Sequence, residues 1–530
     1  MIETRNLSMT IHGIPVLHDV DLTIAPGKIT GLVGESGSGK SMTALAIMGL
    51  APRGAKISGE VLLDGEDLTQ RSEKEYCDLR GNRIGMIFQE PMTALNPVQP
   101  IGKQVAETLL VHGKAGRAEA MEIAAQKLAR VGLPPEKVPL SRYPHELSGG
   151  QRQRVAIAMA IALHPELLIA DEPTTALDVT TQAQILDLLR ELVAEEGMSL
   201  LLITHDLAVV AQMADHVAVM QRGEIVEQAP TETLFCNMQH PYTRALLEAS
   251  GHQPAGVDAP QKAPLLSVEN AVREYRTARP TPFSPPGRFR AVNQVSFEIG
   301  SGESVGLVGE SGCGKSTLTR ALLGLEAVQS GRIRFRGEEM RPGVDPAVRA
   351  GIQVVFQDPY GSFNPRWQVG KLVSEPFHLL AQRPADWRDR VAQALEEVGI
   401  SPDAINRYPH EFSGGQRQRI AIARALILRP DLIILDEAVS ALDVSIRAQI
   451  LDLLADLRAR HHMAYLFISH DLSVVRRVTD RVLVMRAGEI VERGETEAVF
   501  TNPTHEYTQS LIEATPEIPA DWRKDARPVV

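Results

Sequence analysis

The nine residues GESGSGKSM, from Gly34 to Met42, return almost unchanged as GESGCGKST from Gly309 to Thr317. Further landmarks follow each copy in the same order, among them FQ, SGGQRQR, a DE pair and a TH or SH pair. The two copies are 275 residues apart at the first landmark and 265 residues apart from SGGQ onward. Solenoid repeats are much shorter, so this spacing predicts two whole domains in tandem.

The domain boundaries follow from this repeat. We expect a first domain at residues 1–250, a flexible linker at 251–264 (GHQPAGVDAPQKAP) and a second domain at 265–530. The stretch RTARPTPFSPPGRFR at 276–290 contains four prolines, and we expect it to form a loop between the first two strands of the second domain. With 530 residues and 44% hydrophobic residues, the chain has enough apolar content for several cores.

The composition argues against several classes of protein. The net charge of −11 does not favour broad binding to nucleic acid. The three cysteines are isolated, so we expect neither disulfides nor a cysteine-rich metal module, and a reducing intracellular setting. No stretch approaches the ~18 apolar residues of a membrane span, and the N-terminus does not resemble a secretion signal. We therefore expect a chain that is soluble by itself.

Apolar segments alternate between strand-like and helix-like patterns in both halves. ITGLVG and SVGLVG are predicted strands that lead into the glycine loops, while LLIADE and LIILDE are predicted strands that end in two carboxylates. Apolar residues at 185, 188, 189, 192 and 193 recur at helical spacing, as do those at 118, 121, 125 and 128. The pattern predicts an α/β fold with a parallel sheet covered on both faces, and a separate helical subdomain.

The glycine loops match the P-loop pattern G-x-x-x-x-G-K-[ST] in its required strand-to-helix context. Such a loop directs backbone N–H groups at phosphate oxygens, while its lysine reaches the β- and γ-phosphates and its serine binds Mg²⁺. An ordinary glycine turn is excluded as an explanation by two matches with further landmarks in fixed order. The predicted nucleotide-binding residues are Ser36, Gly37, Ser38, Gly39, Lys40, Ser41 and Met42 in the first loop and Ser311, Gly312, Cys313, Gly314, Lys315, Ser316 and Thr317 in the second.

Two carboxylates end a strand in each half, Asp171-Glu172 and Asp436-Glu437. An aspartate here can hold the Mg²⁺ shell and the following glutamate can accept a proton from attacking water, a role that contributes about 10²–10⁴-fold in rate. The structural alternative is an acidic helix cap after a strand. Because the carboxylate pair recurs downstream of a P-loop in both halves, the catalytic interpretation is favoured.

The SGGQ segments are a second anion site in each half. Ser148, Gly149, Gly150 and Gln151, and likewise Ser413, Gly414, Gly415 and Gln416, precede an apolar helix whose N-terminus suits phosphate. One nucleotide needs only one P-loop. The surplus site makes sense if each half completes the nucleotide site of the other.

This ordered set of motifs resembles the nucleotide-binding domain of ABC transporters over almost all of both halves. The resemblance implies a RecA-like parallel core, an antiparallel β subdomain and an α-helical subdomain in each half. It also implies a head-to-tail sandwich in which one ATP lies between Lys40 and Ser413, and another between Lys315 and Ser148. By the same resemblance, Gln89 and Gln357 contact Mg²⁺ or water, His205 and His470 contact the γ-phosphate, and Asp178 and Asp443 link the two sites. The implied Mg²⁺ ligands are Ser41, Gln89, Asp171, Ser316, Gln357 and Asp436.

The family also has an aromatic residue that stacks on adenine, 23 residues before the P-loop glycine. Ile11 stands there in the first half, whereas Tyr275 is the expected stacking residue in the second half. Losing an aromatic face removes an estimated ~1–3 kcal/mol of stacking. We therefore expect the first site to bind ATP more weakly.

FQEPMTALNP, FQDPYGSFNP and the tails HPYTRALLEA and HEYTQSLIEA resemble the ATPases of dipeptide, oligopeptide and nickel importers. Fused chains resemble the microcin C/oligopeptide and glutathione types. The resemblance implies a peripheral ATPase on the cytoplasmic face of the bacterial inner membrane, bound to two permease subunits and indirectly served by an extracytoplasmic substrate-binding protein. Neither nucleic acid nor an iron–sulfur cluster is expected. The transported substrate cannot be read from this chain.

Two other functions remain open at this point. One is a soluble tandem ABC ATPase that acts on ribosomes or DNA, although the short, proline-rich linker and the lack of zinc cysteines favour it less. The other is a non-hydrolysing regulatory module, which the intact catalytic residues disfavour.

Overall fold

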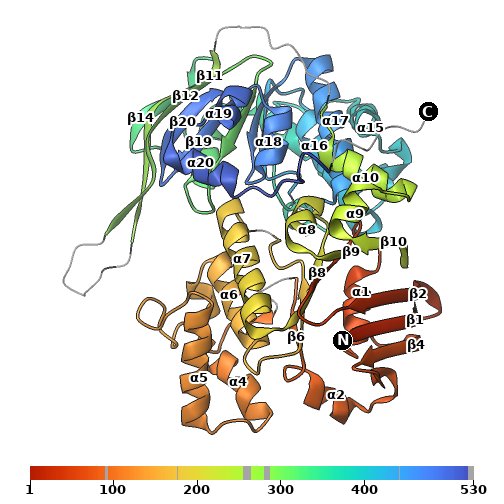
Figure 1. The fold of residues 1–530 in the computed structure, drawn as a ribbon. Coiled ribbons are helices and arrows are strands. Elements are labelled where there is room, and N and C mark those ends of the chain that lie inside the picture. Colours follow the sequence, from red (N-terminus) through yellow and green to blue (C-terminus); the bar gives the residue numbers. More distant parts are fainter. Residues whose placement is uncertain are drawn as a thin grey trace.

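The computed structural model describes residues 1–89, 94–175, 177–254, 264–277, 279, 287–440 and 442–522. Most of the predicted linker, residues 255–263, and the middle of the predicted loop, residues 280–286, lie outside these ranges. Figure 1 shows two units stacked on each other, the first coloured red to yellow-green and the second green to blue.

Each unit is built on a six-stranded sheet. In the first unit the order is β10-β9-β3-β8-β7-β6, and only the edge strand β10 is antiparallel to its neighbour. The second unit has the equivalent order β20-β19-β13-β18-β17-β16. The strands are β3 (Ile29–Val33), β6 (Ile84–Ile87), β7 (Leu167–Asp171), β8 (Ser199–Thr204), β9 (His216–Gln221), β10 (Glu224–Pro230), β13 (Ser304–Val308), β16 (Ile352–Val355), β17 (Leu432–Asp436), β18 (Ala464–Ile468), β19 (Arg481–Arg486) and β20 (Glu489–Glu495).

A four-stranded antiparallel sheet packs beside each central sheet, in the orders β2-β1-β4-β5 and β12-β11-β14-β15. Its strands are β1 (Ile2–Ile11), β2 (Ile14–Ile24), β4 (Ala55–Leu63), β5 (Glu66–Asp67), β11 (Pro264–Arg276), β12 (Arg288–Gly300), β14 (Ser330–Phe335) and β15 (Glu338–Glu339). The expected antiparallel subdomain is therefore present in both units.

Helices cover the sheets and form the expected helical subdomains. Those of the first unit are α1 (Lys40–Ile47), α2 (Glu73–Leu79), α4 (Ile101–Val111), α5 (Arg117–Arg130), α6 (Gly149–Ala160), α7 (Val179–Glu196), α8 (Leu207–Met213), α9 (Thr231–Cys236) and α10 (Pro241–Gly251). Those of the second are α11 (Lys315–Leu322), α12 (Pro346–Ala350), α13 (Pro359–Ser362), α14 (Val369–Val373), α15 (Trp387–Glu397), α16 (Gly414–Leu426), α17 (Val444–His461), α18 (Leu472–Val478), α19 (Thr496–Thr501) and α20 (Glu506–Glu513). None of the helices in these ranges is long and apolar enough to cross a membrane.

The helical periodicity at 118–128 predicted α5 correctly but placed its buried face slightly wrong. Leu128 is buried as expected, yet Ala118 is exposed and the inward positions are Ala120, Ala124 and Lys127. Ala118 stands in the first turn of the helix, where the chain still faces solvent. Alanine is found both inside and on the surface of proteins. The alanines of this helix therefore predict poorly which of its faces is buried.

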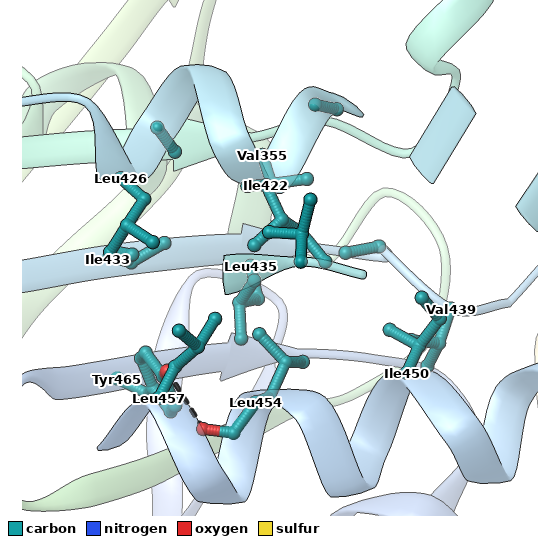
Figure 2. Packing of buried hydrophobic residues seen from close by; sticks show 14 of the residues in the cluster. Val355, Ile422, Leu426, Ile433, Leu435, Val439, Ile450, Leu454, Leu457 and Tyr465 are labelled. Carbon is teal, nitrogen blue, oxygen red and sulfur yellow. Dashed lines mark hydrogen bonds between the residues drawn. The ribbon is translucent and has the colours of Figure 1, made fainter. Parts of the chain in front are cut away.

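Both faces of the central sheets are covered, as the buried strands require. In the second unit Ile433 and Leu435 of β17 belong to the cluster that includes α16 and α17, as Figure 2 shows. Leu432 and Ile434, on the opposite face of the same strand, belong to the cluster with α11 and the antiparallel sheet. This packing fixes the carboxyl end of β17, where Asp436 lies.

The tails of the two units cross the junction between them. α10 of the first unit packs against α17 of the second, and His252 Nε2 lies 2.6 Å from Oδ1 of Asp452. In return, Trp522 of the second unit stacks on Phe235 of the first, with ring centroids 5.8 Å apart. Each tail thus contacts the opposite unit, an arrangement that the repeat alone did not reveal.

Candidate functional site

The P-loop lysines are buried and fixed by their own loops. Lys40 Nζ donates to the carbonyl oxygens of Gly34 at 2.7 Å and Glu35 at 2.8 Å. Lys315 Nζ donates equivalently to Gly309 at 2.6 Å and Glu310 at 2.9 Å. Burial lowers the pKa of Lys40, while nearby carboxylates oppose this effect. Each lysine is therefore placed at the helix N-terminus before any phosphate arrives.

The first glycine of each loop is required by the backbone. Gly34 has φ 155° and Gly309 has φ 151°. A Cβ at either position would stand 2.1 Å from a carbonyl oxygen, that of Met220 or Met485. Neither conformation nor space admits a side chain, so both loops need glycine to pass beside strands β9 and β19.

The two aspartates lie at the buried ends of β7 and β17. Burial raises the pKa of Asp171, and a hydrogen bond from Ser41 partly offsets this rise. Burial, together with the charge of Glu437, raises the pKa of Asp436 to about 6. Oδ1 of Asp171 is buried and has no hydrogen-bond partner among the described residues. A buried carboxylate with spare acceptor capacity beside a serine is suited to a cation.

The adjacent glutamates have left-handed backbone conformations, with φ 48° at Glu172 and φ 51° at Glu437. Such backbone strain is concentrated at functional sites. Glu172 accepts hydrogen bonds from Gln89 at 2.9 Å and Thr175 at 2.9 Å, and its Oε1 lies 3.2 Å from Nδ1 of His205. Burial alone would raise the pKa of Glu172, but His205 and Thr175 hold it at about 2. The predicted glutamine, glutamate and histidine of the first unit therefore meet.

Counting only residues that the structure describes, the glutamate of the second unit has fewer contacts. His470 Nδ1 lies 3.4 Å from Oε1 of Glu437, and this histidine lowers the pKa of Glu437 against the effect of burial. Ser440, which corresponds to Thr175, donates to the backbone carbonyl of Glu437 at 2.9 Å instead of to its carboxylate. The two centres share their residue types but differ in how firmly the glutamate is held.

A cleft of about 1040 Å³ opens around the second P-loop. Lys315, Ser316, Gln357, Asp436, Glu437 and His470 line this cleft, together with Asp178 from the first unit. The structure therefore brings the predicted P-loop, glutamine, carboxylate pair and histidine to one place. It also adds a residue of the opposite unit, as the composite-site hypothesis requires.

Beside the second P-loop, Asp178 and its neighbours make a contact between the units. The backbone N–H of Ser311 donates to the Asp178 carboxylate, and Thr180 Oγ1 donates to Oε1 of Glu310 at 3.0 Å. At the other site, Asp443 lies near enough to Lys40 for its charge to act on the lysine. Both linking aspartates thus approach the P-loop of the opposite unit.

Among the described residues, no hydrogen bond joins Ser148 or Ser413 to a P-loop. Ser148 and Ser413 are exposed, and neither Ser148 nor Gly149 nor Gly150 is among the described residues that line the cleft at Lys315. Each serine caps its own helix, accepting from Gln151 N at 3.2 Å or Gln416 N at 3.3 Å. The expected contact with nucleotide therefore stays a prediction.

Strand register places Ile11 and Tyr275 at equivalent positions. His18 N–H and Asn293 N–H donate to the matching carbonyls of Gly223 and Gly488. Four residues before these, Ile14 pairs with Ile11 and Phe289 pairs with Tyr275. The Tyr275 hydroxyl donates to Glu326 at 2.6 Å. The proline-rich insertion therefore lengthens the hairpin without changing this equivalence.

Two residues that contact the P-loops escaped prediction as site residues. The hydroxyl oxygens of Tyr242 and Tyr507 accept hydrogen bonds from the N–H groups of Glu35, at 3.0 Å, and Glu310, at 2.9 Å. Their recurrence in both tails, 265 residues apart, was the available signal. Nothing in the local sequence ties a tail to a loop some 200 residues earlier.

Comparison with known proteins agrees with these observations. A family model described as "ABC transporter" matches residues 17–175 and 292–440, and one described as "Oligopeptide/dipeptide transporter, C-terminal region" matches residues 226–264 and 491–529. The chain is 48% identical to the glutathione import ATP-binding protein GsiA of Escherichia coli strain K12, covering 95% of this chain and 87% of that protein. It is 47% identical to the peptidoglycan transport ATP-binding protein YejF of Agrobacterium fabrum, covering 98% and 97%.

A solved structure with both units in one chain is also similar. The archaeal ribosome recycling factor aABCE1, in complex with the ribosomal stalk protein aP1, matches with a TM-score of 0.58 and 23% identity, covering 89% of this chain and 86% of that one. At this identity the likeness concerns the fold alone.

Proposed function

Because this chain belongs to the ABC transporter family of ATP-binding proteins, we propose that it is the energy-coupling ATPase of an importer for di- or oligopeptides or related compounds. It hydrolyses ATP, as members of this family do. The relatives with nearly full coverage are named for glutathione import and peptidoglycan transport, and both tails match the oligopeptide transporter region. The cargo class proposed is therefore peptide-like.

The observation that carries this proposal is the meeting of Asp178 with Ser311 beside a complete set of ATPase side chains. It supports two composite ATP sites, one between Lys40 and Ser413-Gly415 and the other between Lys315 and Ser148-Gly150. Ser148 and Ser413 are exposed here and thus free to contact a nucleotide held by the opposite unit, and ATP binding then draws the units together. Hydrolysis and phosphate release then let the units part, and this movement changes the access state of the permease.

The residues present fit Mg²⁺ as the cofactor. Within the described part of the chain, Asp171 offers a buried oxygen that has no hydrogen-bond partner, next to Ser41. Gln89 contacts Glu172, the residue that follows Asp171. Ser316, Asp436 and Gln357 line the second cleft. Bound Mg²⁺ would neutralise phosphate charge. Glu172 and Glu437 accept the proton of the attacking water, while His205 and His470 orient these glutamates and contact the γ-phosphate.

We further propose the division into units at 1–250 and 265–530, and two permease subunits as partners. The location proposed is the cytoplasmic face of the bacterial inner membrane, with cargo delivered to the permease by an external binding protein. These assignments rest on the importer relatives.

The test is reconstitution with the two permease subunits of a peptide importer. Proteoliposomes containing the complex should take up a labelled peptide or glutathione only with ATP inside. A chain with both Glu172→Gln and Glu437→Gln should assemble equally well but support no uptake. Failure to associate with any permease, combined with ATPase activity stimulated by ribosomes, would support the soluble alternative instead.

A further inference from the structure

Each tail helix presents a tyrosine to the P-loop of its own unit. Tyr242 is the second residue of α10 and Tyr507 the second of α20. The preceding histidine caps each helix, since His240 Nδ1 accepts from Tyr242 N at 3.2 Å and His505 Nδ1 accepts from Tyr507 N at 3.1 Å. The cap fixes the start of the helix and with it the direction of the tyrosine.

The tyrosine hydroxyl groups accept a hydrogen bond from the equivalent backbone N–H in both units. Tyr242 accepts from Glu35 N at 3.0 Å, and Tyr507 accepts from Glu310 N at 2.9 Å. The peptide group before Glu35 is therefore held on both sides, by the tyrosine at its N–H and by Lys40 at the Gly34 carbonyl. The same two contacts hold the peptide between Gly309 and Glu310. The tyrosine thus fixes the segment that positions the lysine.

The opposite unit reaches the same point. Thr180 of the first unit donates to the side chain of Glu310, whose backbone N–H is held by Tyr507. Burial raises the pKa of Tyr507, and among the smaller contributions is the charge of Asp178. Burial likewise raises the pKa of Tyr242 to about 12, with a contribution from the charge of Asp443. Each tyrosine therefore stands where its own P-loop meets the linking aspartate of the other unit.

We propose that Tyr242 and Tyr507 are positioning residues for ATP hydrolysis. Each tyrosine couples the conformation of its own P-loop to contact with the opposite unit. The hydroxyl holds the loop in the conformation that presents the lysine, and it does so at the cross-unit contact. Figure 1 shows α20 next to the end of α7 that follows Asp178. The tail that matches the oligopeptide transporter region thereby becomes part of the ATPase mechanism. This inference rests on the composite sites of the proposed function but not on the identity of the cargo.

The test is the removal of each hydroxyl. Tyr242→Phe and Tyr507→Phe keep the ring but leave a loop N–H without its acceptor. We expect kcat of the purified chain to fall about tenfold for each variant, with KM for ATP changed less than about twofold, because the phosphate-facing N–H groups remain. Melting temperatures should stay within a few degrees of the wild type, which separates positioning from unfolding.

Thr243→Val is the matched control. Thr243 is the next residue of α10, is fully buried, and its hydroxyl has no partner among the described residues. The substitution perturbs the same helix without touching the P-loop, so kcat should be unchanged. Wild-type kcat in Y242F and Y507F, or equal losses in T243V, would overturn the proposal. An inactive wild-type chain would instead contradict the ATPase assignment.

The cross-unit part is tested by combining Y507F with Thr180→Val. Both act on Glu310, so their effects on kcat should be smaller together than the product of the single effects. Strict multiplication of the two effects would show that Tyr507 acts without the opposite unit, against the proposal.

Discussion

Glu172 and Glu437 occupy the same place in the two units but are held unequally. Gln89, Thr175 and His205 all contact the carboxylate of Glu172, whereas at Glu437 the His470 ring approaches the carboxylate at 3.4 Å. Both lie at the end of a buried strand, in a strained conformation, beside an aspartate. Their residue types therefore predict two hydrolytic centres, while their surroundings predict unequal rates.

Separate substitution of the two glutamates tests this. Glu172→Gln and Glu437→Gln each remove the general base of one site. Because the two sites depend on each other, each variant should reduce steady-state ATP turnover by about 10²-fold or more. The measurement is phosphate release at saturating ATP. One variant with unchanged turnover would contradict the prediction of two competent sites.

Ile11 provides a second prediction at this scale. It is equivalent to Tyr275 by strand register, so Ile11→Tyr should add an aromatic face to the first site. We expect ATP to bind there about 5- to 150-fold more tightly, corresponding to about 1–3 kcal/mol. The affinity is measured by fluorescent-nucleotide titration in a chain that also carries Lys315→Ala. Tyr275→Ile in a Lys40→Ala chain is the converse control and should weaken binding.

The ion pair between Arg429 and Glu397 is partly exposed, and it makes the stability of the second unit sensitive to acid. Arg429 approaches Glu397 at 2.5 Å, and His461 lies 3.4 Å from it. Burial opposes ionisation, but Arg429 and His461 lower the pKa of Glu397 below its ordinary value of 4.5. A lowered carboxyl pKa stabilises the fold above the ordinary value, and this stabilisation is lost as the pH falls below it.

Glu397→Gln should therefore lower the melting temperature at pH 7, by the equivalent of about 1 kcal/mol because Arg429 is partly exposed. The difference from wild type should shrink between pH 5 and pH 3, as the wild-type carboxyl becomes protonated. Calorimetric scans across this range check the prediction. A constant difference at all pH values would show that packing, not charge, is responsible.

At the scale of elements, the strands that carry the site were predicted from local pattern. ITGLVG and LLIADE are buried apolar runs, and they form β3 and β7. The phase of α5 was less certain because alanine contrasts weakly with its neighbours. The SGGQ helices were predicted to bind nucleotide across the junction, yet in this structure their serines serve as caps, a role that the same residue type predicts equally well.

Substitution of Leu435 tests how much the packing around β17 contributes to stability. It is the fourth of the five residues of β17 and is fully buried, between side chains of α16 and α17 (Figure 2). Leu435→Ala should destabilise the second unit by about 2–5 kcal/mol, from lost burial and the cavity left behind. Thermal unfolding checks this, with Leu325→Ala, at a residue 49% exposed, as a control that should change little. A change equal to that of L325A would show that the core closes over the gap.

At the scale of the whole molecule, the sequence predicted the duplication but not the contact of each tail with the opposite unit. The constant 265-residue spacing indicated two similar units. Contacts such as Trp522 on Phe235, or His252 beside Asp452, join residues hundreds of positions apart and leave no periodic mark. The same holds for the tyrosines at the P-loops.

Trp522→Ala tests the contact of the second tail with the first unit. Loss of the ring exposes Phe235, so amide hydrogen exchange in α9 should become faster. Trp387→Ala serves as the control, because that tryptophan packs against Arg383 within the second unit. Unchanged exchange in α9 would mean that the tail contact does not hold the units together.

The fusion of both copies into one polypeptide also affects how they can evolve. In a homodimer every substitution alters both sites at once. Here Ile11 and Tyr275, or Thr175 and Ser440, have diverged independently within one molecule. Natural selection can therefore make one site hydrolyse ATP faster and let the other site regulate it. This needs no second gene, and wrongly paired subunits cannot form.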